Sequence, residues 1–278
     1  MRGMGVKLGG TAFFVRMSSE IPGLSFTYLV TAKHIIEEIC KPPKNGKIYV
    51  RANVKQGGAT HISTSLSDWH LASAEAAEKE VDVAVMPFEL DGLDFMSIPV
   101  ESAATYKRIQ DENISIGDEI CIIGLFTRLE GEHRNMPIAR IGNIAAFPED
   151  KVRTKAGLID AYLVEARSIG GLSGSPVMVN ITGFRPPDHA RPEPGVRINI
   201  FFWLGLIHGH WDTELSGDYS ATEDTFNNEK LNMGIAVVVP VDKILEVLNH
   251  EKLSKERERI TKSMCEKRMP TPDSTGSR

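Results

Sequence analysis

Cysteine is scarce in this sequence, and several other features of large protein classes are missing as well. The 278 residues include three cysteines, Cys40, Cys121 and Cys265, and an odd number argues against a disulfide framework. Lysine and arginine together number 32 against 37 acidic residues, so the net charge of −5 gives no basic field for nucleic acid. No apolar run reaches the length of a secretory signal or a membrane span. We therefore expect a soluble, cytoplasmic protein with free thiols that binds neither nucleic acid nor membranes.

Signatures of bound metals and cofactors are also missing. The sequence has no zinc-finger spacing, no phosphate-binding loop, no heptads and no internal repeat. His208 and His210 stand two residues apart on an expected strand and would share one face, as a metal-binding pair does, but no third ligand is suitably spaced. We therefore expect neither a metal nor a cofactor.

Three short motifs are present, and they carry the chemistry of the chain. They are T-A-K-H ending at His34, D-V-A-V beginning at Asp82, and G-L-S-G-S-P with Ser173 at its centre. A serine hydroxyl is a poor nucleophile at neutral pH, so it needs an imidazole to take its proton and a carboxylate to hold that imidazole in the useful tautomer. We predict that His34, Asp82 and Ser173 form such a catalytic triad.

The local setting of each motif agrees with this prediction. His34 follows the β-rich run F-T-Y-L-V-T-A and precedes a short helical run, and Asp82 opens the buried-strand pattern V-A-V-M-P. The glycines around Ser173 allow the backbone N–H groups of Gly171 and Ser173 to point at a developing oxyanion. These two amides are the predicted oxyanion hole.

The order of the three motifs separates two classes of hydrolase. An α/β-hydrolase runs Ser, Asp, His and places G-x-S-x-G on a strand-to-helix turn, whereas here Ser175 replaces the last glycine and Pro176 leads into a strand. The order His, Asp, Ser resembles the trypsin-like (chymotrypsin-fold) serine peptidase family over nearly the whole chain, from Gly9 to the helix after Pro240.

The resemblance is to bacterial members of that family. G-G-x-S-G-S-P is similar to the pattern of glutamyl endopeptidases, and I-G-D-E-I-C-I-I-G at 116–124 and G-I-A-V-V-V-P at 234–240 resemble the protease domain of high-temperature-requirement proteases. The resemblance implies two antiparallel six-stranded β-barrels with the active site between them. Composition and periodicity alone indicate only a mostly β protein. Leu172 stands where zymogen-type relatives carry an acid, so activation by a new N-terminal ammonium is not expected.

The expected organisation is a peptidase domain over residues 1–250, a C-terminal helix over 241–264 and a disordered tail over 265–278. The first barrel is expected at about 9–98, with β-rich runs near Phe13, Tyr28, Ile48, Ile62 and Val83. The second is expected at about 115–240, with six runs: I-C-I-I-G, I-G-N-I-A-A, D-A-Y-L-V-E-A, S-P-V-M-V-N, I-N-I-F-F-W-L-G-L-I-H and M-G-I-A-V-V-V. A proline-rich segment, 183–195, is expected to be a surface loop. The acidic segment 211–231 is expected to be a solvated loop or a lid over the cleft.

Substrate preference is predicted from residues around the third motif. In the glutamyl endopeptidases a hydroxyl residue at the place of Ser168 and a histidine on the strand L-G-L-I-H-G-H-W bind an acidic substrate side chain. His208 falls one position later than that histidine, so either a bulge restores its orientation or it points away. Arg167 would add positive charge near the pocket floor or extend to solvent. We expect Ser168, His208, His210 and Arg167 to bind substrate and to favour Glu or Asp before the cut bond.

Two functions remain open at this stage. The first is a serine endopeptidase that acts through an acyl-enzyme on a protein or peptide substrate. The alternative is a protease-like module that binds peptides without turnover. The intact set of motifs favours the enzyme, and no pattern in the sequence indicates an oligomeric state.

Overall fold

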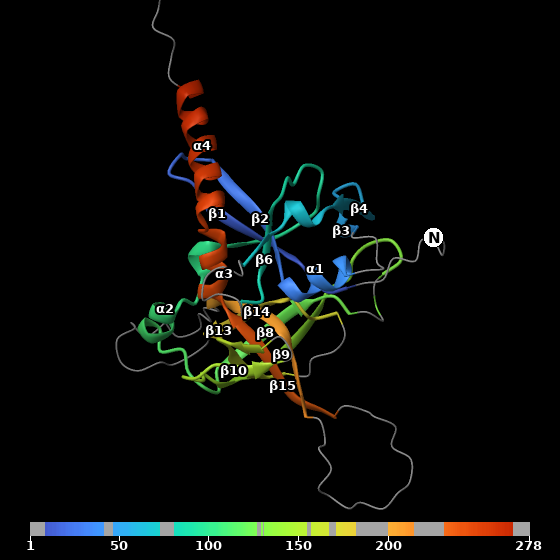
Figure 1. Ribbon diagram of the computed structural model, residues 1–278, viewed down its shortest axis with the longest axis vertical. Coiled ribbons are helices and arrows are strands. Elements are labelled where there is room, and N and C mark those ends of the chain that lie inside the picture. Colours follow the sequence, from blue (N-terminus) through green and yellow to red (C-terminus); the bar gives the residue numbers. More distant parts are fainter. Residues whose placement is uncertain are drawn as a thin grey trace, which may run out of the picture.

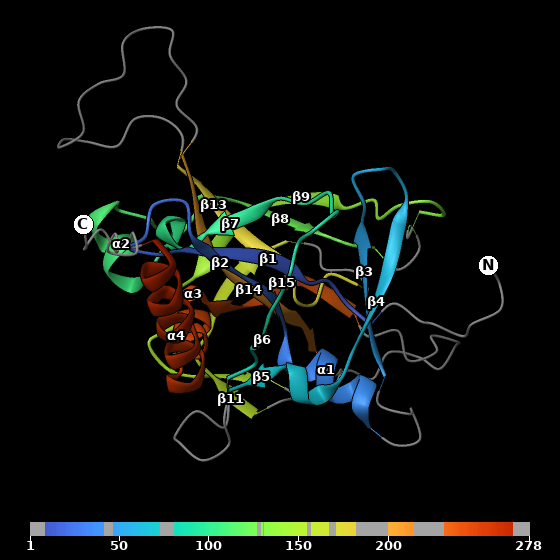
Figure 2. The same ribbon diagram turned by 90° about the horizontal axis from the view of Figure 1, so that it is seen from above.

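The computed structural model describes residues 9–41, 47–72, 81–126, 129, 131–154, 157–166, 171–181, 200–213 and 231–268, with the backbone only at 210–213, 231–233 and 267–268. Within these residues the fold is mostly β, in two units that follow one another along the chain (Figure 1). Helices α3 and α4 lie on one side of the molecule and the β3–β4 hairpin on the other, as Figure 2 also shows. No helix of the described chain is long and apolar enough to cross a membrane.

The C-terminal unit is a closed antiparallel barrel of six strands in the order β12-β15-β14-β13-β8-β9. Its strands are β8 (Glu119–Gly124), β9 (Ile138–Ala146), β12 (Tyr162–Glu165), β13 (Pro176–Ile181), β14 (Ile200–Thr213) and β15 (Leu231–Pro240). The six runs predicted for the second barrel correspond to these six strands. A short hairpin of β10 (Val152–Thr154) and β11 (Gly157–Ile159) accompanies the barrel.

Alternation of side chains fills this barrel. Ile120 and Ile122 of β8 face the same interior as Val177 and Val179 of β13, and all four side chains are fully buried. Successive residues of a strand point to opposite faces, so every second apolar residue enters the core. Burial of one such side chain stabilises the fold by about 1.5–3 kcal/mol. The core therefore fixes the strands that carry the C-terminal part of the site.

The N-terminal unit differs from the predicted first barrel. Its strands β1 (Phe13–Ser18), β2 (Ser25–Thr31), β5 (His70–Leu71), β6 (Ala84–Pro87) and β7 (Ser97–Pro99) form a sheet in the order β5-β6-β2-β1-β7, with β7 parallel to β1. A separate hairpin pairs β3 (Ile48–Asn53) with β4 (Ala59–Thr64). The prediction of a closed six-stranded barrel is not confirmed by the described residues. The edge strands are too short to close a barrel, and the prolines that end β6 and β7 have no N–H to donate to a further ladder.

The C-terminal helical segment is broken where one helix was predicted. α3 (Val241–Leu248) and α4 (Glu251–Arg268) are separated by Asn249 and His250. Arg257 of α4 donates from Nη1 to the Leu248 carbonyl at 2.7 Å and from Nη2 to Asn249 Oδ1 at 3.1 Å. This guanidinium thus pairs with the last carbonyl of α3, which has no donor within the helix, and with the side chain of the residue that follows. Of the predicted tail, 265–268 is therefore helical, and 269–278 lies outside the described residues.

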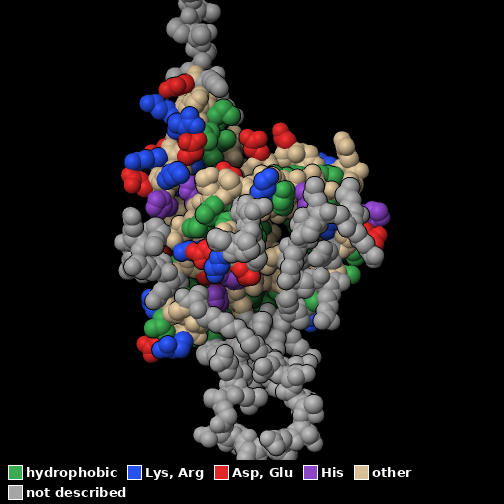
Figure 3. Space-filling view, turned by 45° about the vertical axis from the view of Figure 1, so that its right-hand side comes forward, with side chains coloured by type: hydrophobic (Ala, Val, Ile, Leu, Met, Phe, Trp, Pro, Cys, Tyr) green, Lys and Arg blue, Asp and Glu red, His purple; other side chains and the backbone are tan. Residues whose placement is uncertain are grey.

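The remaining helical elements of the described chain are short, and α4 extends away from the body of the molecule (Figure 1). The short ones are the helices α1 (Lys33–Cys40) and α2 (Tyr106–Asp111) and the 3₁₀ turns η1 (Leu66–Asp68) and η2 (Val100–Ser102). Acidic and basic side chains are mixed along the surface of α4 (Figure 3), where Lys255 pairs with Glu251 and Arg259 with Glu256. Exposed pairs of this kind contribute little to stability, because water and salt screen them.

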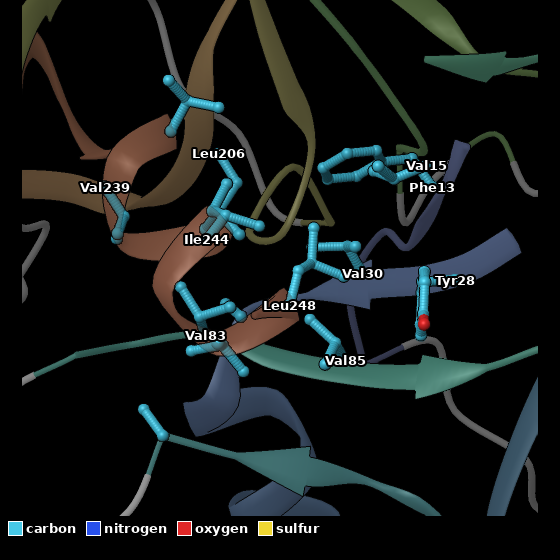
Figure 4. Close-up of a cluster of buried hydrophobic side chains, with 14 of the residues drawn as sticks. Phe13, Val15, Tyr28, Val30, Val83, Val85, Leu206, Val239, Ile244 and Leu248 are labelled. Carbon is cyan, nitrogen blue, oxygen red and sulfur yellow. The ribbon is translucent and has the colours of Figure 1, made fainter. Parts of the chain in front are cut away.

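A shared hydrophobic core joins the two units. Trp203 of the barrel is fully buried, and its ring meets Phe13 of β1 edge-on at 5.6 Å. Ile244 and Leu248 of α3 lie among side chains of both units (Figure 4). Close packing leaves side chains little room to shift, so the shared core holds the two units in a fixed relation. The candidate site lies where they meet.

Candidate active site

His34 and Asp82 lie at the same end of two paired strands. β2 pairs antiparallel with β6, and Thr31 at the end of β2 is opposite Ala84 at the start of β6. His34 follows β2 in the first turn of α1, and Asp82 lies two residues before Ala84, the first residue of β6. An antiparallel ladder puts the end of one strand beside the start of its partner, so the two side chains meet.

Both oxygens of the Asp82 carboxylate accept hydrogen bonds from His34. Asp82 Oδ1 accepts from the His34 backbone N–H at 2.8 Å, and Asp82 Oδ2 lies 2.7 Å from His34 Nδ1. The side chain of Asp82 is 4% exposed and that of His34 is 34% exposed. An ionised carboxylate can only accept, so Nδ1 of His34 carries the hydrogen and Nε2 is left as the basic nitrogen.

The electrostatics suit an acid–base pair. Burial alone would raise the pKa of Asp82, but the hydrogen bonds from His208 and His34 outweigh burial and hold this pKa well below its usual value. Burial opposes protonation of His34, yet the hydrogen bond to Asp82 and the charges of Asp82, Glu38 and Glu37 raise its pKa above the usual value. The imidazolium form of His34 is thus stabilised, as a general base in acyl transfer requires.

A second histidine meets the same carboxylate. His208 of β14 makes a hydrogen bond from Nδ1 to Asp82 Oδ2, and its ring stands edge-on to the His34 ring at 5.3 Å. The β14–β15 register shifts between Ile207 and Gly209, which is the bulge that the sequence left open. Bulges re-aim side chains. From the sequence, His208 was predicted to bind substrate. Its contact with Asp82 was missed because the sequence does not show whether β14 contains a bulge, and so does not fix the direction of this side chain.

Ser173 lies in the tight turn that precedes β13, and a threonine anchors this turn. The Thr11 N–H donates to the Ser173 carbonyl at 2.9 Å, and Thr11 Oγ1 donates to the Gly171 carbonyl at 2.7 Å. The same hydroxyl accepts from the Leu125 N–H at 2.8 Å. Thr11 is 5% exposed and was missed by the sequence analysis, although it ends the G-G-T run just before β1. It ties the turn that carries Ser173 to the N-terminal unit.

Gly174 brings this turn against the segment that leads to His34. Its φ is +81°, and a Cβ at this position would lie 2.2 Å from the Thr11 carbonyl oxygen and 3.2 Å from Ala32 N. Only glycine allows both the backbone conformation and the close approach. Ser173 therefore stands beside the start of α1. Within the described residues no hydrogen bond joins Ser173 to His34, and catalytic hydrogen bonds often tighten only when substrate is bound.

The two predicted oxyanion-hole amides have no acceptor in the described part of the chain. The neighbouring N–H groups are satisfied: Gly174 donates to the Ile207 carbonyl at 2.7 Å and Ser175 to the Leu172 carbonyl at 2.9 Å. Gly171 has a φ of +99°, which favours glycine. Two amides beside Ser173 that have no acceptor among the described residues suit an incoming oxygen.

The residues beside Ser173 point into the barrel. The Leu172 side chain is fully buried in the barrel core. Ser175 is fully buried as well, and its Oγ has no hydrogen-bond partner among the described residues. Gly124 makes room for it, because a Cβ there would lie 1.9 Å from that hydroxyl. Leu172, directly before Ser173, cannot hold a terminal ammonium as an acid would.

His34, Asp82 and His208 are also the group that could be considered for a metal ion, since their ligand atoms all lie within 4.8 Å of one another. Tetrahedral zinc with bonds of about 2.0–2.1 Å keeps its ligand atoms about 3.3 Å apart. The 2.7 Å between His34 Nδ1 and Asp82 Oδ2 is shorter and is the length of a hydrogen bond. As arranged, these three residues fit shared hydrogens rather than a metal.

The remaining predicted substrate residues lie partly outside the description. Arg167 and Ser168 fall outside the described residues, as does the proline-rich segment 183–195. His210 lies on β14 with its backbone only, and most of the acidic segment 211–231 is not described. Their assignment to the substrate pocket stays a prediction.

Comparisons with known proteins add two solved structures. Neither the models of protein families nor the curated proteins match this sequence. The protease domain of MamO from Magnetospirillum magneticum, in its apo form, is 14% identical over 70% of this chain and 91% of its own, with a TM-score of 0.37. The Rv3671c protease, in an inactive form, is 12% identical over 87% of this chain and 88% of its own, also with a TM-score of 0.37. Similarities this low do not establish a function for this chain.

Proposed function

We propose that this protein is a serine endopeptidase in which His34, Asp82 and Ser173 form the catalytic triad. The observation that carries the proposal is the His34–Asp82 pair. One carboxylate oxygen accepts the backbone N–H of His34 and the other lies 2.7 Å from its ring Nδ1. These two contacts fix both the position and the tautomer of the imidazole, as a catalytic triad requires. A chance ion pair at the surface requires neither a fixed ring position nor a fixed tautomer.

The proposed reaction has two halves. His34 Nε2 takes the hydroxyl proton of Ser173 as Oγ attacks the scissile carbonyl carbon, and the tetrahedral oxyanion is held by the N–H groups of Gly171 and Ser173. His34 then gives the proton to the leaving amine, which breaks the C–N bond and leaves an acyl-enzyme. Water attacks the ester by the same route in the second half. Asp82 stays ionised throughout, in keeping with its lowered pKa.

The proposed substrate is a protein or a peptide. We retain an acidic side chain before the cut bond as the proposed preference, because Arg167 and Ser168 precede the nucleophile turn and a carboxylate needs charge-assisted partners once it loses water. The Nδ1 atom of His208 is occupied by Asp82, so His208 can take part in this recognition only through Nε2, beside Arg167, Ser168 and His210.

One observation favours the second candidate, a peptide-binding module without turnover. In the described residues the acid–base pair is formed but no hydrogen bond links it to Ser173. If Ser173 stays out of reach of His34, the protein would bind a peptide at this site and leave it intact.

Labelling with a fluorophosphonate probe separates the two candidates. Such probes form a covalent bond only with an activated serine, so the wild-type protein should be labelled and Ser173→Ala should not. Ser175→Ala is the matched control, since it removes a hydroxyl two residues away that is buried and has no described partner. Peptide binding without any labelling of the wild-type protein would favour the binding module.

A further inference from the structure

We propose that His208 is a positioning residue for the acid–base pair: its Nδ1–H holds the Asp82 carboxylate in the orientation that receives His34. This inference rests on the proposed peptidase function and gives His208 a role different from substrate recognition. It stands on the contact that His208 makes from β14, a strand of the C-terminal barrel, to an aspartate of the N-terminal unit.

The first argument is the completeness of the hydrogen bonds around Asp82. Its Oδ1 accepts from the backbone of His34, and its Oδ2 accepts from both imidazoles. At 4% exposure the carboxylate has almost no water to replace a missing donor. A buried charge that loses one of its donors retains the cost of desolvation and gains freedom to rotate. His208 is the donor that does not come from the residue being oriented.

The second argument is how the chain delivers this side chain. Ile207, the residue before His208, makes two backbone hydrogen bonds to the nucleophile turn: its carbonyl accepts from Gly174 at 2.7 Å and its N–H donates to Ser175 at 2.9 Å. The bulge then turns His208 toward Asp82. One short stretch of β14 therefore holds the serine turn through its backbone and the aspartate through its side chain. His208 couples the position of the nucleophile to the position of the pair that activates it.

The third argument is electrostatic. The titratable groups that face His34 are Asp82 from the segment before β6, Glu37 and Glu38 from α1, and His208 from β14. A donor on Asp82 Oδ2 draws charge from the oxygen that His34 also uses. Without that donor the carboxylate is more basic and attracts the His34 imidazolium more strongly. Loss of His208 is thus expected to raise the pKa of His34 and to move the acid limb of the activity profile to higher pH.

The test compares His208→Leu with His208→Asn. Leucine removes the donor at similar volume, whereas the Nδ2 of asparagine is bonded to Cγ as the Nδ1 of histidine is and can donate from nearly the same place. Because misplacement of catalytic groups by about 1 Å costs about 100-fold in rate, we expect kcat to fall about 10–100-fold in His208→Leu with little change in KM. His208→Asn should recover most of kcat and return the acid limb toward its wild-type pH.

A second measurement does not need turnover. In Ser173→Ala protein labelled with ¹⁵N-histidine, NMR titration should show a higher pKa for His34 when His208 is leucine than when it is histidine or asparagine. Unchanged kcat and an unchanged His34 titration in folded His208→Leu would overturn the inference. Altered preference for the residue before the cut bond, with kcat intact, would overturn it in favour of substrate recognition. If the wild-type protein cleaves nothing but the NMR shift is found, the peptidase proposal fails while the positioning of Asp82 stands.

Discussion

Gly174→Ala is the substitution whose consequence follows most directly from the structure of the nucleophile turn. The added methyl would lie 2.2 Å from the Thr11 carbonyl oxygen and 2.4 Å from Thr31 Oγ1. Both neighbours are fixed, since Thr31 Oγ1 donates to the Thr11 carbonyl at 2.7 Å and the Thr11 N–H donates to Ser173. The alanine methyl therefore cannot be accommodated by rotating one free side chain.

The expected loss in the free energy of unfolding of Gly174→Ala has two parts that can be separated by experiment. A side chain at a φ of +81° costs about 1–2 kcal/mol, and overpacking against fixed atoms adds about 1–3 kcal/mol. Gly23 has the same φ of +81° with nothing within 4 Å of its Cβ position, so Gly23→Ala should show the first part alone. A shift of the turn by about 1 Å should also lower kcat/KM about 100-fold.

Urea denaturation and peptide hydrolysis measure both parts. We expect Gly174→Ala to lower the free energy of unfolding by about 2–5 kcal/mol, out of the 5–15 kcal/mol that is usual for a domain, and to lose activity. Gly23→Ala should lose less stability and keep its activity. Equal stability loss in the two variants, with activity retained in Gly174→Ala, would refute the packing described around the turn.

Three further expectations concern Ser175, the cysteines and the ionisable pair of the site. Ser175→Ala should leave the free energy of unfolding unchanged or raise it, because it removes a buried hydroxyl without a described partner, and a loss above about 1 kcal/mol in urea denaturation would contradict this. The three cysteines are unpaired, so a reducing agent should leave both Tm and hydrolysis unchanged, and a Tm lowered by several degrees would reveal a disulfide. Folding lowers the pKa of Asp82, so its contribution to stability is present above the ordinary carboxyl pKa and is lost as the pH falls through the folded value. Folding raises the pKa of His34, so its contribution is full below the ordinary imidazole pKa and is lost as the pH rises through the raised value. Urea midpoints measured below about pH 5 should therefore fall less steeply in Asp82→Asn than in wild type, and parallel curves would contradict the sign.

The C-terminal barrel could be predicted from the sequence because its strands are long enough to show a pattern. β14 and β15 are 14 and 10 residues long, and their apolar runs are unbroken in the core. In the N-terminal unit, β5 has two residues and β7 has three. Strands that short carry no periodicity, and the parallel pairing of β7 with β1 depends on contacts remote in sequence. The expectation that the N-terminal unit also forms a closed barrel came from the family resemblance, and its short strands gave no local pattern to correct it.

The residues of the site likewise divide into those that the sequence could predict and those that it could not. The motifs around His34, Asp82 and Ser173 could be found because each has a short signature beside a strand. Thr11 carries no signature of its own, since its role depends on backbone groups about 160 residues away in the chain. His208 was recognised as a site residue, but its partner depends on a bulge, and a one-residue change of register reverses the face of a strand.

Cleavage of a peptide library by the purified protein tests the central claim most directly. The account predicts hydrolysis by the wild-type protein, loss of several orders of magnitude in Ser173→Ala and in His34→Ala, and a loss of about 10⁴ in Asp82→Asn, with all three variants folded. Cleavage by Ser173→Ala at the wild-type rate would contradict the account, and so would a folded wild-type protein that binds the library and cleaves none of it.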